Sequence, residues 1–188
     1  MTKIISIHQN DFELITHCLE QNRQAQKSLY DRYANKMLSV CRRYIKDMQY
    51  AEDVMITAFV KAFKSLDKFE KKGSFEGWLR RIMVNESLSY LRSQKDHYIY
   101  KVNENDKYEE AEAEINLDME QWQNVIDELP NGCKMVFNLF VFEEFKHHEI
   151  AEKLNININT SKSQLAHAKK LLQFKINQIN ALGNEKSK

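Results

Sequence analysis

Residues that break regular backbone structure are rare in this sequence, and their scarcity limits the possible folds more than any other feature. The 188 residues include only one proline and four glycines. Folds made of many short strands depend on tight turns built from these residues, so the sequence predicts an all-α fold. Hydrophobic residues make up 43% of the chain and charged residues 29%. The helices therefore have enough apolar surface to form a core and enough charge for a solvated exterior.

The strongest helical pattern lies in residues 47–64. Apolar side chains recur there at the spacing of one helix face, at Ala51, Val54, Met55, Ala58, Phe59, Ala62 and Phe63. We place Glu52 and Asp53 in the first turn, where negative charge suits the positive end of the helix dipole. The alternative interpretation is that these two acids form an exposed patch for a partner.

Similar patterns predict helices on both sides of this segment. They are expected over about residues 11–24, 25–46, 78–93, 119–129 and 134–143. The stretch between the two halves is polar, acidic and weakly periodic, which is typical of a solvated tether. The predicted layout is a helical domain at residues 1–95, an acidic flexible linker at 96–117, a smaller helical domain at 118–180 and a polar tail at 181–188.

Aromatic and basic residues surround a loop predicted between Leu66 and Gly77. Phe69 and Phe75 alternate there with lysines, and Trp78 opens the next helix. Rings that stack on bases and cations that hold phosphates suit single-stranded nucleic acid. For Trp78 we favour the simpler interpretation that it docks the helix onto the core. For the Lys, Arg and Asn residues around it, both interpretations stay open.

Residues 144–174 read as a short helix, a tight turn and a longer helix. Asn155 stands where a left-handed residue is needed, and Asn157 can cap the second helix. No acidic residue occurs between Lys153 and Glu185. This pattern is typical of a helix-turn-helix whose second helix lies in the DNA major groove. An ordinary helical hairpin with a solvated polar face is the alternative.

Patterns for catalysis or metal binding are not found. The sequence lacks a phosphate-binding P-loop, a G-x-G-x-x-G motif and a G-x-S-x-G motif. Cys18, Cys41 and Cys133 are widely spaced, which predicts reduced, buried thiols instead of a disulfide framework or a zinc site. We therefore expect no catalytic residue, no cofactor and no metal. The lack of a membrane-spanning or signal pattern predicts the cytoplasm.

Two separate stretches match the motifs of one protein family. In the first half the matching residues are Tyr50–Val54, Phe59, Lys61, Phe63, Phe75–Leu79, Ile82, Asn85, Leu88 and Arg92. In the second half they are Ile126–Pro130, Val136, Phe137, Glu149–Leu154, Thr160, Lys162, Ser163, Leu165 and Ala168. In this order and spacing, the chain resembles the extracytoplasmic-function (ECF) subfamily of sigma-70 RNA polymerase sigma factors.

The resemblance implies a transcription initiation factor of two helical domains. Its implied partners are core RNA polymerase (the largest-subunit clamp and the flap regions), promoter DNA and an anti-sigma factor, without direct membrane insertion. Polymerase binding is implied for Glu52, Asp53, Ile56, Thr57 and Lys61. Binding of the −10 promoter element is implied for Lys71, Lys72, Trp78, Arg80, Arg81, Asn85 and Arg92. Binding of the −35 element is implied for Thr160, Lys162, Ser163, Gln164, His167 and Lys169.

Some positions depart from the family pattern. The family usually has Gln and an acid at Ile56 and Thr57, Asp at Ser89, Arg at Lys134, Val at Ser161 and Arg at Gln164. We expect Ser161 to remove apolar packing from the recognition helix. Gln164 and His167 stand in place of cations, so fewer phosphate contacts are expected. One hypothesis is that Gln164 reads an adenine edge.

Two other functions stay open on the sequence. A free-standing helix-turn-helix regulator would bind duplex DNA without polymerase, usually as a dimer on a two-fold site. A helical interaction module would have no DNA role. The sigma factor is favoured because residues 50–92 have no task in a simple regulator.

Overall fold

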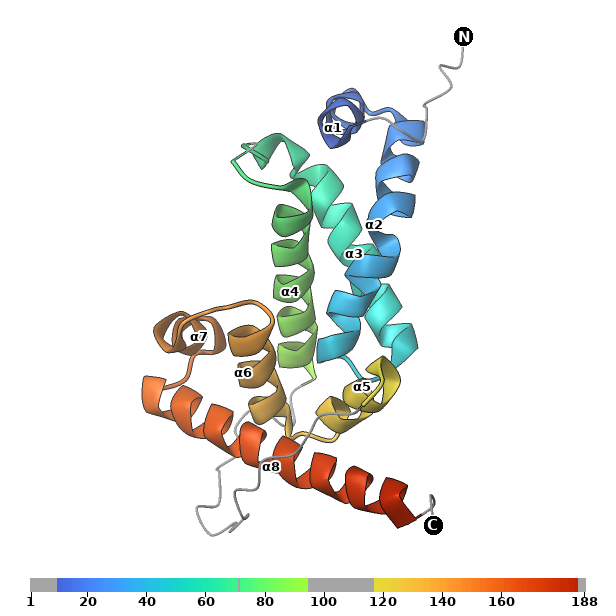
Figure 1. Ribbon diagram of the computed structural model, residues 1–188. Coiled ribbons are helices and arrows are strands. Elements are labelled where there is room, and N and C mark those ends of the chain that lie inside the picture. The colour runs from blue at the N-terminus through green and yellow to red at the C-terminus, as the bar shows by residue number, and fades with distance from the viewer. Residues whose placement is uncertain (1–9, 71, 95–116, 186–188) are drawn as a thin grey trace. The chain divides into compact units, whose positions relative to one another are not determined.

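The structure is a computed structural model that describes residues 10–70, 72–94 and 117–185 (Figure 1). Within these ranges the regular structure is helical throughout, without strands, so the all-α prediction is confirmed. The chain divides into two compact units, Met1–Gln94 and Lys95–Lys188. The predicted acidic linker lies outside the described residues except for its last position.

The described part of unit 1 contains four α-helices and one short 3-10 turn. They are α1 (Asp11–Leu19), α2 (Arg23–Tyr44), α3 (Met48–Lys64), η1 (Leu66–Lys68) and α4 (Phe75–Ser93). Each α-helix follows a residue whose side chain accepts a hydrogen bond from a backbone N–H of the first turn; these caps are Asn10, Asn22, Asp47 and Ser74. Local cap chemistry therefore sets the helix starts.

Two of these caps correct the predicted boundaries. The first helix ends at Leu19 instead of residue 24, because Gln21 adopts a positive φ of 60° and Asn22 caps α2. Similarly, α4 begins at Phe75, three residues earlier than expected, because the Ser74 hydroxyl accepts a hydrogen bond from the N–H of Gly77 at 3.1 Å.

The start of α3 also corrects the placement of two acids. Asp47 caps this helix and accepts hydrogen bonds from the N–H groups of Gln49 and Tyr50 at 2.9 and 3.1 Å. Glu52 and Asp53 consequently lie in the second turn, and the prediction that they occupy the first turn was wrong. Their negative charge is therefore not explained by the helix terminus.

Helices α2, α3 and α4 run alongside one another, and their apolar faces form the core of unit 1 (Figure 1). Its fully buried side chains include Leu29, Met37, Leu79 and Met83. Helix α1 packs on α2 through polar contacts as well. Arg32 donates a hydrogen bond to Asp11 at 2.6 Å, and the hydroxyl of Tyr33 donates to the same carboxylate.

Unit 2 is built from α5 (Met119–Asp127), α6 (Asn131–Val141), α7 (His147–Leu154) and α8 (Ile158–Glu185). Helix α8 packs against α5, α6 and α7. Helix α6 begins three residues before the predicted start at residue 134, and α8 continues through most of the predicted polar tail. Among the described residues, no helix has both the length and the apolar character that a membrane span requires.

The connection between α7 and α8 has the predicted helix-turn-helix geometry. Asn155 ends α7 with φ 52° and ψ 50°, which is the left-handed conformation. The N–H of Ile156 then donates to the carbonyl of Ala151 at 3.0 Å. The side chain of Asn157 accepts from the N–H of Asn159 at 2.8 Å and caps α8. The predictions for Asn155 and Asn157 are confirmed.

Candidate polymerase and nucleic-acid interfaces

The first candidate site is the outer face of α3. All five predicted polymerase-binding residues are exposed there, at Glu52, Asp53, Ile56, Thr57 and Lys61. Their spacing of three and four residues places them on one side of the helix. Sequence reasoning missed Val60, which is 46% exposed and lies one turn after Ile56, itself 49% exposed. The signal available in the sequence was two aliphatic residues four apart that fall outside the apolar stripe predicted for the core.

Charged residues border these two aliphatic side chains. Glu52 and Asp53 precede Ile56, and Lys61 follows Val60. The Lys61 ammonium lies 2.6 Å from the Glu86 carboxylate of α4. Because the Lys61 side chain is 56% exposed, this ion pair adds little to stability. The α3 face, defined here as Glu52, Asp53, Ile56, Thr57, Val60 and Lys61, thus has an apolar centre and a charged border.

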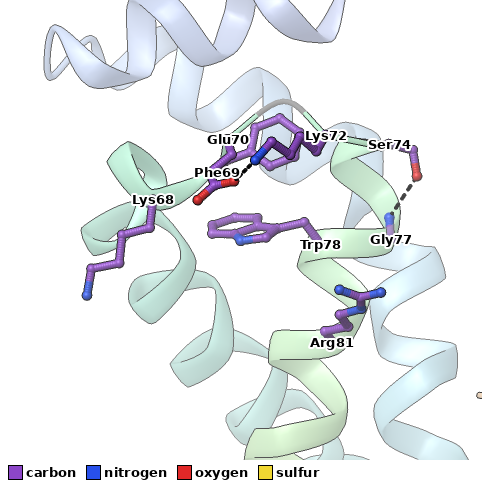
Figure 2. A pocket seen from close by; sticks show the side chains of 9 residues that line it. Lys68, Phe69, Glu70, Lys72, Ser74, Gly77, Trp78 and Arg81 are labelled. Atoms are coloured by element: carbon purple, nitrogen blue, oxygen red, sulfur yellow. Dashed lines mark hydrogen bonds and ion pairs between the residues drawn. The ribbon is translucent and has the colours of Figure 1, made fainter. Parts of the chain in front are cut away.

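The second candidate site is a pocket between η1 and the start of α4 (Figure 2). It has a volume of about 430 Å³ and is lined by Lys68, Phe69, Glu70, Lys72, Gly73, Ser74, Gly77, Trp78 and Arg81. Figure 2 shows the indole of Trp78 lying across the pocket beside Phe69, with Arg81 one turn further along α4. The loop and the helix start predicted from the sequence therefore form one concave surface.

Trp78 is packed on one side and open to the pocket on the other. Its ring lies 5.5 Å from Phe69 and 5.7 Å from Phe75, measured between ring centroids. These contacts dock the start of α4 on the core, which is the role favoured from the sequence. The indole is nevertheless only half-buried and lines the pocket. It is therefore held rigidly with part of its surface available for stacking.

Positive charge dominates the lining of the pocket. Lys68, Lys72 and Arg81 contribute cations, and Glu70 contributes a carboxylate. Lys72 pairs with Glu70 at 2.8 Å, but both side chains are largely exposed, so the pair is weak. Neither Lys68 nor Glu70 belonged to the predicted −10 set. Lys71, which did, lies outside the described residues.

The other predicted −10 residues divide between two sides of α4. Trp78, Arg81, Asn85 and Arg92 recur at intervals of three, four and seven residues, so they form one stripe along the helix. Within this stripe, Arg81, Asn85 and Arg92 are exposed. Arg80 is half-buried and lies two residues after Trp78, on a different side of α4. The structure thus brings four of these residues together and separates Arg80 from them.

The third candidate site is the outer face of α8, defined here by its exposed residues Asn159, Lys162, Ser163, Ala166, Lys169 and Lys170. Three of the predicted −35 residues are part of it, namely Lys162, Ser163 and Lys169, and Thr160 is half-buried at its edge. Sequence reasoning missed Asn159, Ala166 and Lys170. All three share the helical phase of Lys162 and Ser163, which was the signal available in the sequence.

Gln164 and His167 contradict their predicted position on the polar side. They are only 2% and 6% exposed, and Ser161 is fully buried. Residues three apart form one row along a helix, so these three side chains share a row, which lies beside the buried Leu165 and Ala168. The prediction placed Gln164 and His167 outward because they are polar, and expected Ser161 at a packing position. The phase of the apolar residues turns all three inward. The hypothesis that Gln164 reads a base edge is withdrawn with this finding.

One hydrogen bond and one close packing contact accompany this inward row. Ser161 Oγ lies 3.0 Å from Nδ1 of His147, so a hydrogen bond stands where the sequence predicted only a loss of apolar packing. Burial of the imidazole, and after it the nearby charges of Lys162 and Lys169, lower the pKa of His147. The amide of Gln164 packs on Gly132 of α6.

Neither a metal cluster nor a reactive thiol is found among the described residues. No group of three or more His, Cys, Asp and Glu side chains could hold a metal ion there. The cysteines are reduced and buried. Burial raises the pKa of Cys18, Cys41 and Cys133 to about 11.

The comparisons with known proteins concern both units. Residues 29–97 match the family model of sigma-70 region 2, and residues 119–172 match that of sigma-70, region 4. The ECF RNA polymerase sigma factor SigW of Bacillus subtilis is 26% identical over 165 residues, which cover 80% of this chain and 88% of that protein. The ECF RNA polymerase sigma-E factor of Haemophilus influenzae is 26% identical over 183 residues, which cover 90% and 96%.

A solved structure supports the same fold. The sigma factor RpoE of Bartonella quintana, in complex with the anti-sigma factor NepR, matches with a TM-score of 0.51 and 19% identity. The match covers 81% of this chain and 96% of that chain. Matches to region 2 and region 4 occur in the order that the motifs predicted, the first almost entirely within unit 1 and the second within unit 2. The chain therefore belongs to the ECF subfamily of the sigma-70 family of RNA polymerase sigma factors.

Proposed function

We propose that this protein directs core RNA polymerase to specific promoters and assists promoter melting. The observation that carries the proposal is the location of the three exposed sites. The α3 face and the pocket lie within the region 2 match, and the α8 face lies within the region 4 match. Sigma factors are initiation factors and not catalysts, so the protein acts without an active site of its own. Its place of work is the cytoplasm, where polymerase and promoter DNA are found.

The α3 face binds the clamp of the polymerase largest subunit in this proposal. Its composition, an apolar centre with a charged border, is that of a protein–protein interface. Covering the exposed surface of Ile56 and Val60 would contribute on the order of 1 kcal/mol each. One of the two departures from the family pattern, Ile56, thus places an apolar side chain where the family usually has Gln.

The pocket takes bases of the −10 element once the strands separate. An unpaired base can stack on the indole of Trp78, while Lys68, Lys72 and Arg81 hold the adjoining phosphates. The stripe of Arg81, Asn85 and Arg92 extends the same surface along α4. Single-stranded DNA is favoured over a duplex at this site because stacking needs an exposed base face.

The α8 face reads the −35 element in the major groove. Lys162, Lys169 and Lys170 are suited to phosphates, whereas Asn159 and Ser163 are suited to base edges. Gln164 and His167 support the helix from within. Each DNA contact is weak alone, and the connection between the units raises the effective concentration of the second contact after the first forms. An anti-sigma factor is proposed as a further partner, since the RpoE of Bartonella quintana is solved with one.

Capture of core polymerase by the full-length protein tests the assignment of α3. The double substitution Glu52→Lys and Asp53→Lys reverses the acidic end of the α3 face, and we expect it to reduce capture at least tenfold. Glu13→Lys with Glu20→Lys changes the net charge equally at two exposed acids outside α3, and capture should stay at the wild-type level. Equal capture of polymerase by both double variants would show that α3 is not part of the interface.

Assistance with melting is tested on two templates. Lys72→Ala and Arg81→Ala should reduce transcription from a fully paired promoter, because the melted strand loses phosphate contacts. The same variants should recover most activity on a promoter with a mismatched, already open −10 region. A defect of equal size on both templates would show that the pocket does not act in melting.

A further inference from the structure

One side chain joins the three helices that make up the helix-turn-helix and its support. His147 is the first residue of α7. Its Nδ1 lies 3.0 Å from Oγ of Ser161 on α8. Its ring stacks on Phe140 of α6, with the centroids 4.9 Å apart and the planes inclined by 27°. The imidazole therefore contacts both helices that neighbour α7.

Ser161 is the fully buried partner in the contact with His147. The residue has 0% exposed surface, so its hydroxyl depends on partners within the fold. A buried hydroxyl that lost its hydrogen bond would destabilise the folded state. Hydrogen bonds are also directional, unlike contacts between aliphatic side chains. A serine bonded to His147 consequently allows α8 less freedom to rotate than a valine at the same position would.

The rotation of α8 matters because the residues after Ser161 lie on the α8 face. Lys162 and Ser163 follow it directly and are exposed. Side chains reach about 5–6 Å from a helix axis, so a rotation of about 20° moves their tips by about 2 Å. A displacement of that size breaks a hydrogen bond to a base edge. The orientation of α8 must therefore be held within narrow limits.

We propose that His147 is a positioning residue for the recognition helix: its hydrogen bond to Ser161 sets the rotation of α8 and thereby the bases that the α8 face reads. Phe140 holds the imidazole plane in place for this bond. His147 touches no base in this account and acts through α8. The inference rests on the proposed function of α8, since it requires α8 to be the helix that reads the −35 element.

The charges around the ring fit a neutral imidazole. Burial comes first among the causes that lower the pKa of His147, followed by Lys162 and Lys169 of α8. Helix α6 contributes the uncharged ring of Phe140. On α7, Glu149 accepts a hydrogen bond from the N–H of Lys146 at 2.7 Å. A neutral imidazole can accept a hydrogen bond from the hydroxyl of Ser161 at Nδ1.

Two substitutions at His147 separate the hydrogen bond from the ring stack. His147→Asn keeps a polar atom close to the position of Nδ1 and removes the ring. His147→Phe keeps a ring for Phe140 and removes the polar atom. Ser161→Ala removes the hydroxyl from the other side. His148→Phe is the matched control, because His148 is the next residue of α7 and is exposed.

The readout is the base preference at the −35 element. Holoenzyme is assembled from core polymerase and each full-length variant, and bound duplexes are selected from a library randomised upstream of a fixed −10 region. Wild type, His147→Asn and His148→Phe should select one shared −35 sequence. His147→Phe and Ser161→Ala should select a shifted or degenerate sequence. They should also bind the wild-type sequence about 3- to 10-fold more weakly. Because both substitutions remove the same hydrogen bond, the double variant His147→Phe with Ser161→Ala should bind no more weakly than either single variant.

Other results would overturn the inference. The first such result is that His147→Phe and Ser161→Ala keep the wild-type base preference and only lower the melting temperature measured by circular dichroism. It would show that His147 and Ser161 contribute to stability and do not position α8. Loss of the preference in His147→Asn and its retention in His147→Phe would assign the positioning to the ring stack. If wild-type holoenzyme selected no −35 sequence at all, the proposed function of α8 itself would fail, and this inference with it.

Discussion

The side-chain amide of Gln164 on α8 lies against Gly132 on α6, so close that a Cβ added to Gly132 would stand 2.7 Å from Nε2 of Gln164. Gln164 is only 2% exposed, and its amide has little room to move aside. The two helices thus meet where a residue without a side chain faces a buried polar one. Gln164 is thus placed for packing within unit 2.

Gly132→Ala tests this close approach. Alanine favours a helix over glycine by about 1 kcal/mol, but overpacking a buried site costs about 1–3 kcal/mol. We expect the free energy of unfolding of unit 2 to fall by up to about 2 kcal/mol. The measurement is urea unfolding followed by the fluorescence of Trp122. A Trp78→Phe background removes the second of the two tryptophans.

The effect of Gly132→Ala on the free energy of unfolding should change sign when Gln164 is shortened. In a Gln164→Ala background the added methyl group has space, so Gly132→Ala should stabilise unit 2 by up to about 1 kcal/mol. Equal effects in the two backgrounds would mean that the two residues do not interact, in contradiction to the contact described above.

The left-handed conformation of Asn155 gives a second prediction. Asn155→Val should lower the free energy of unfolding of unit 2 by about 1–2 kcal/mol, since a branched side chain clashes with the backbone at positive φ. Asn155→Gly should leave it unchanged or raise it slightly. The neighbouring substitution Asn159→Val, at an exposed position with ordinary helical backbone, serves as the control in the same urea experiment. A loss in Asn159→Val as large as that in Asn155→Val would contradict the conformational explanation.

The sequence predicted the fold well where one physical signal acted alone. The apolar stripe of α3 was strong because Val54, Ala58 and Ala62 all face the core. The capping chemistry of Asn157 and the backbone tolerance of Asn155 located the turn of the helix-turn-helix. These features are local, so neighbouring residues suffice to predict them.

The candidate sites were harder to predict where polarity and helical phase disagreed. Ser161, Gln164 and His167 are polar but lie on an inward row, and the partners that make this possible, Gly132 and His147, are distant in sequence. The pocket beside Trp78 likewise depends on how the η1 loop folds back on α4. Tertiary contacts of this kind cannot be read from a periodic pattern.

The thiols should be inert in the folded protein. Burial raises the pKa of all three cysteines to about 11, so at about pH 8 the reactive thiolate is scarce and shielded. An aromatic disulfide reagent should react with the native protein only at the rate at which the protein unfolds. In guanidinium chloride the same reagent should react rapidly with all three thiols. Rapid reaction of even one thiol under native conditions would contradict the buried assignment.

Acid should weaken unit 2 through His147. Its pKa in the folded state lies below its usual value of 6.5, through burial and the charges of Lys162 and Lys169. As the pH falls below 6.5, the unfolded state binds a proton at this position before the folded state does. The stability that is present above pH 6.5 is therefore lost as the pH drops through the lowered pKa. His147→Phe lacks this titration. Its unfolding free energy should decline less than that of wild type between about pH 7.5 and 5, and parallel declines would contradict the assignment.

The central claim is that the protein recruits polymerase to promoters, and transcription in vitro tests it most directly. The purified full-length protein is mixed with core polymerase and a library of genomic fragments, and transcript starts are mapped. We predict starts at discrete sites that share a −35 and a −10 sequence and are absent with core polymerase alone. They should be strongly reduced by Glu52→Lys with Asp53→Lys. No starts beyond those of core polymerase, together with tight binding of the isolated protein to a palindromic duplex, would contradict the claim and indicate a free-standing regulator.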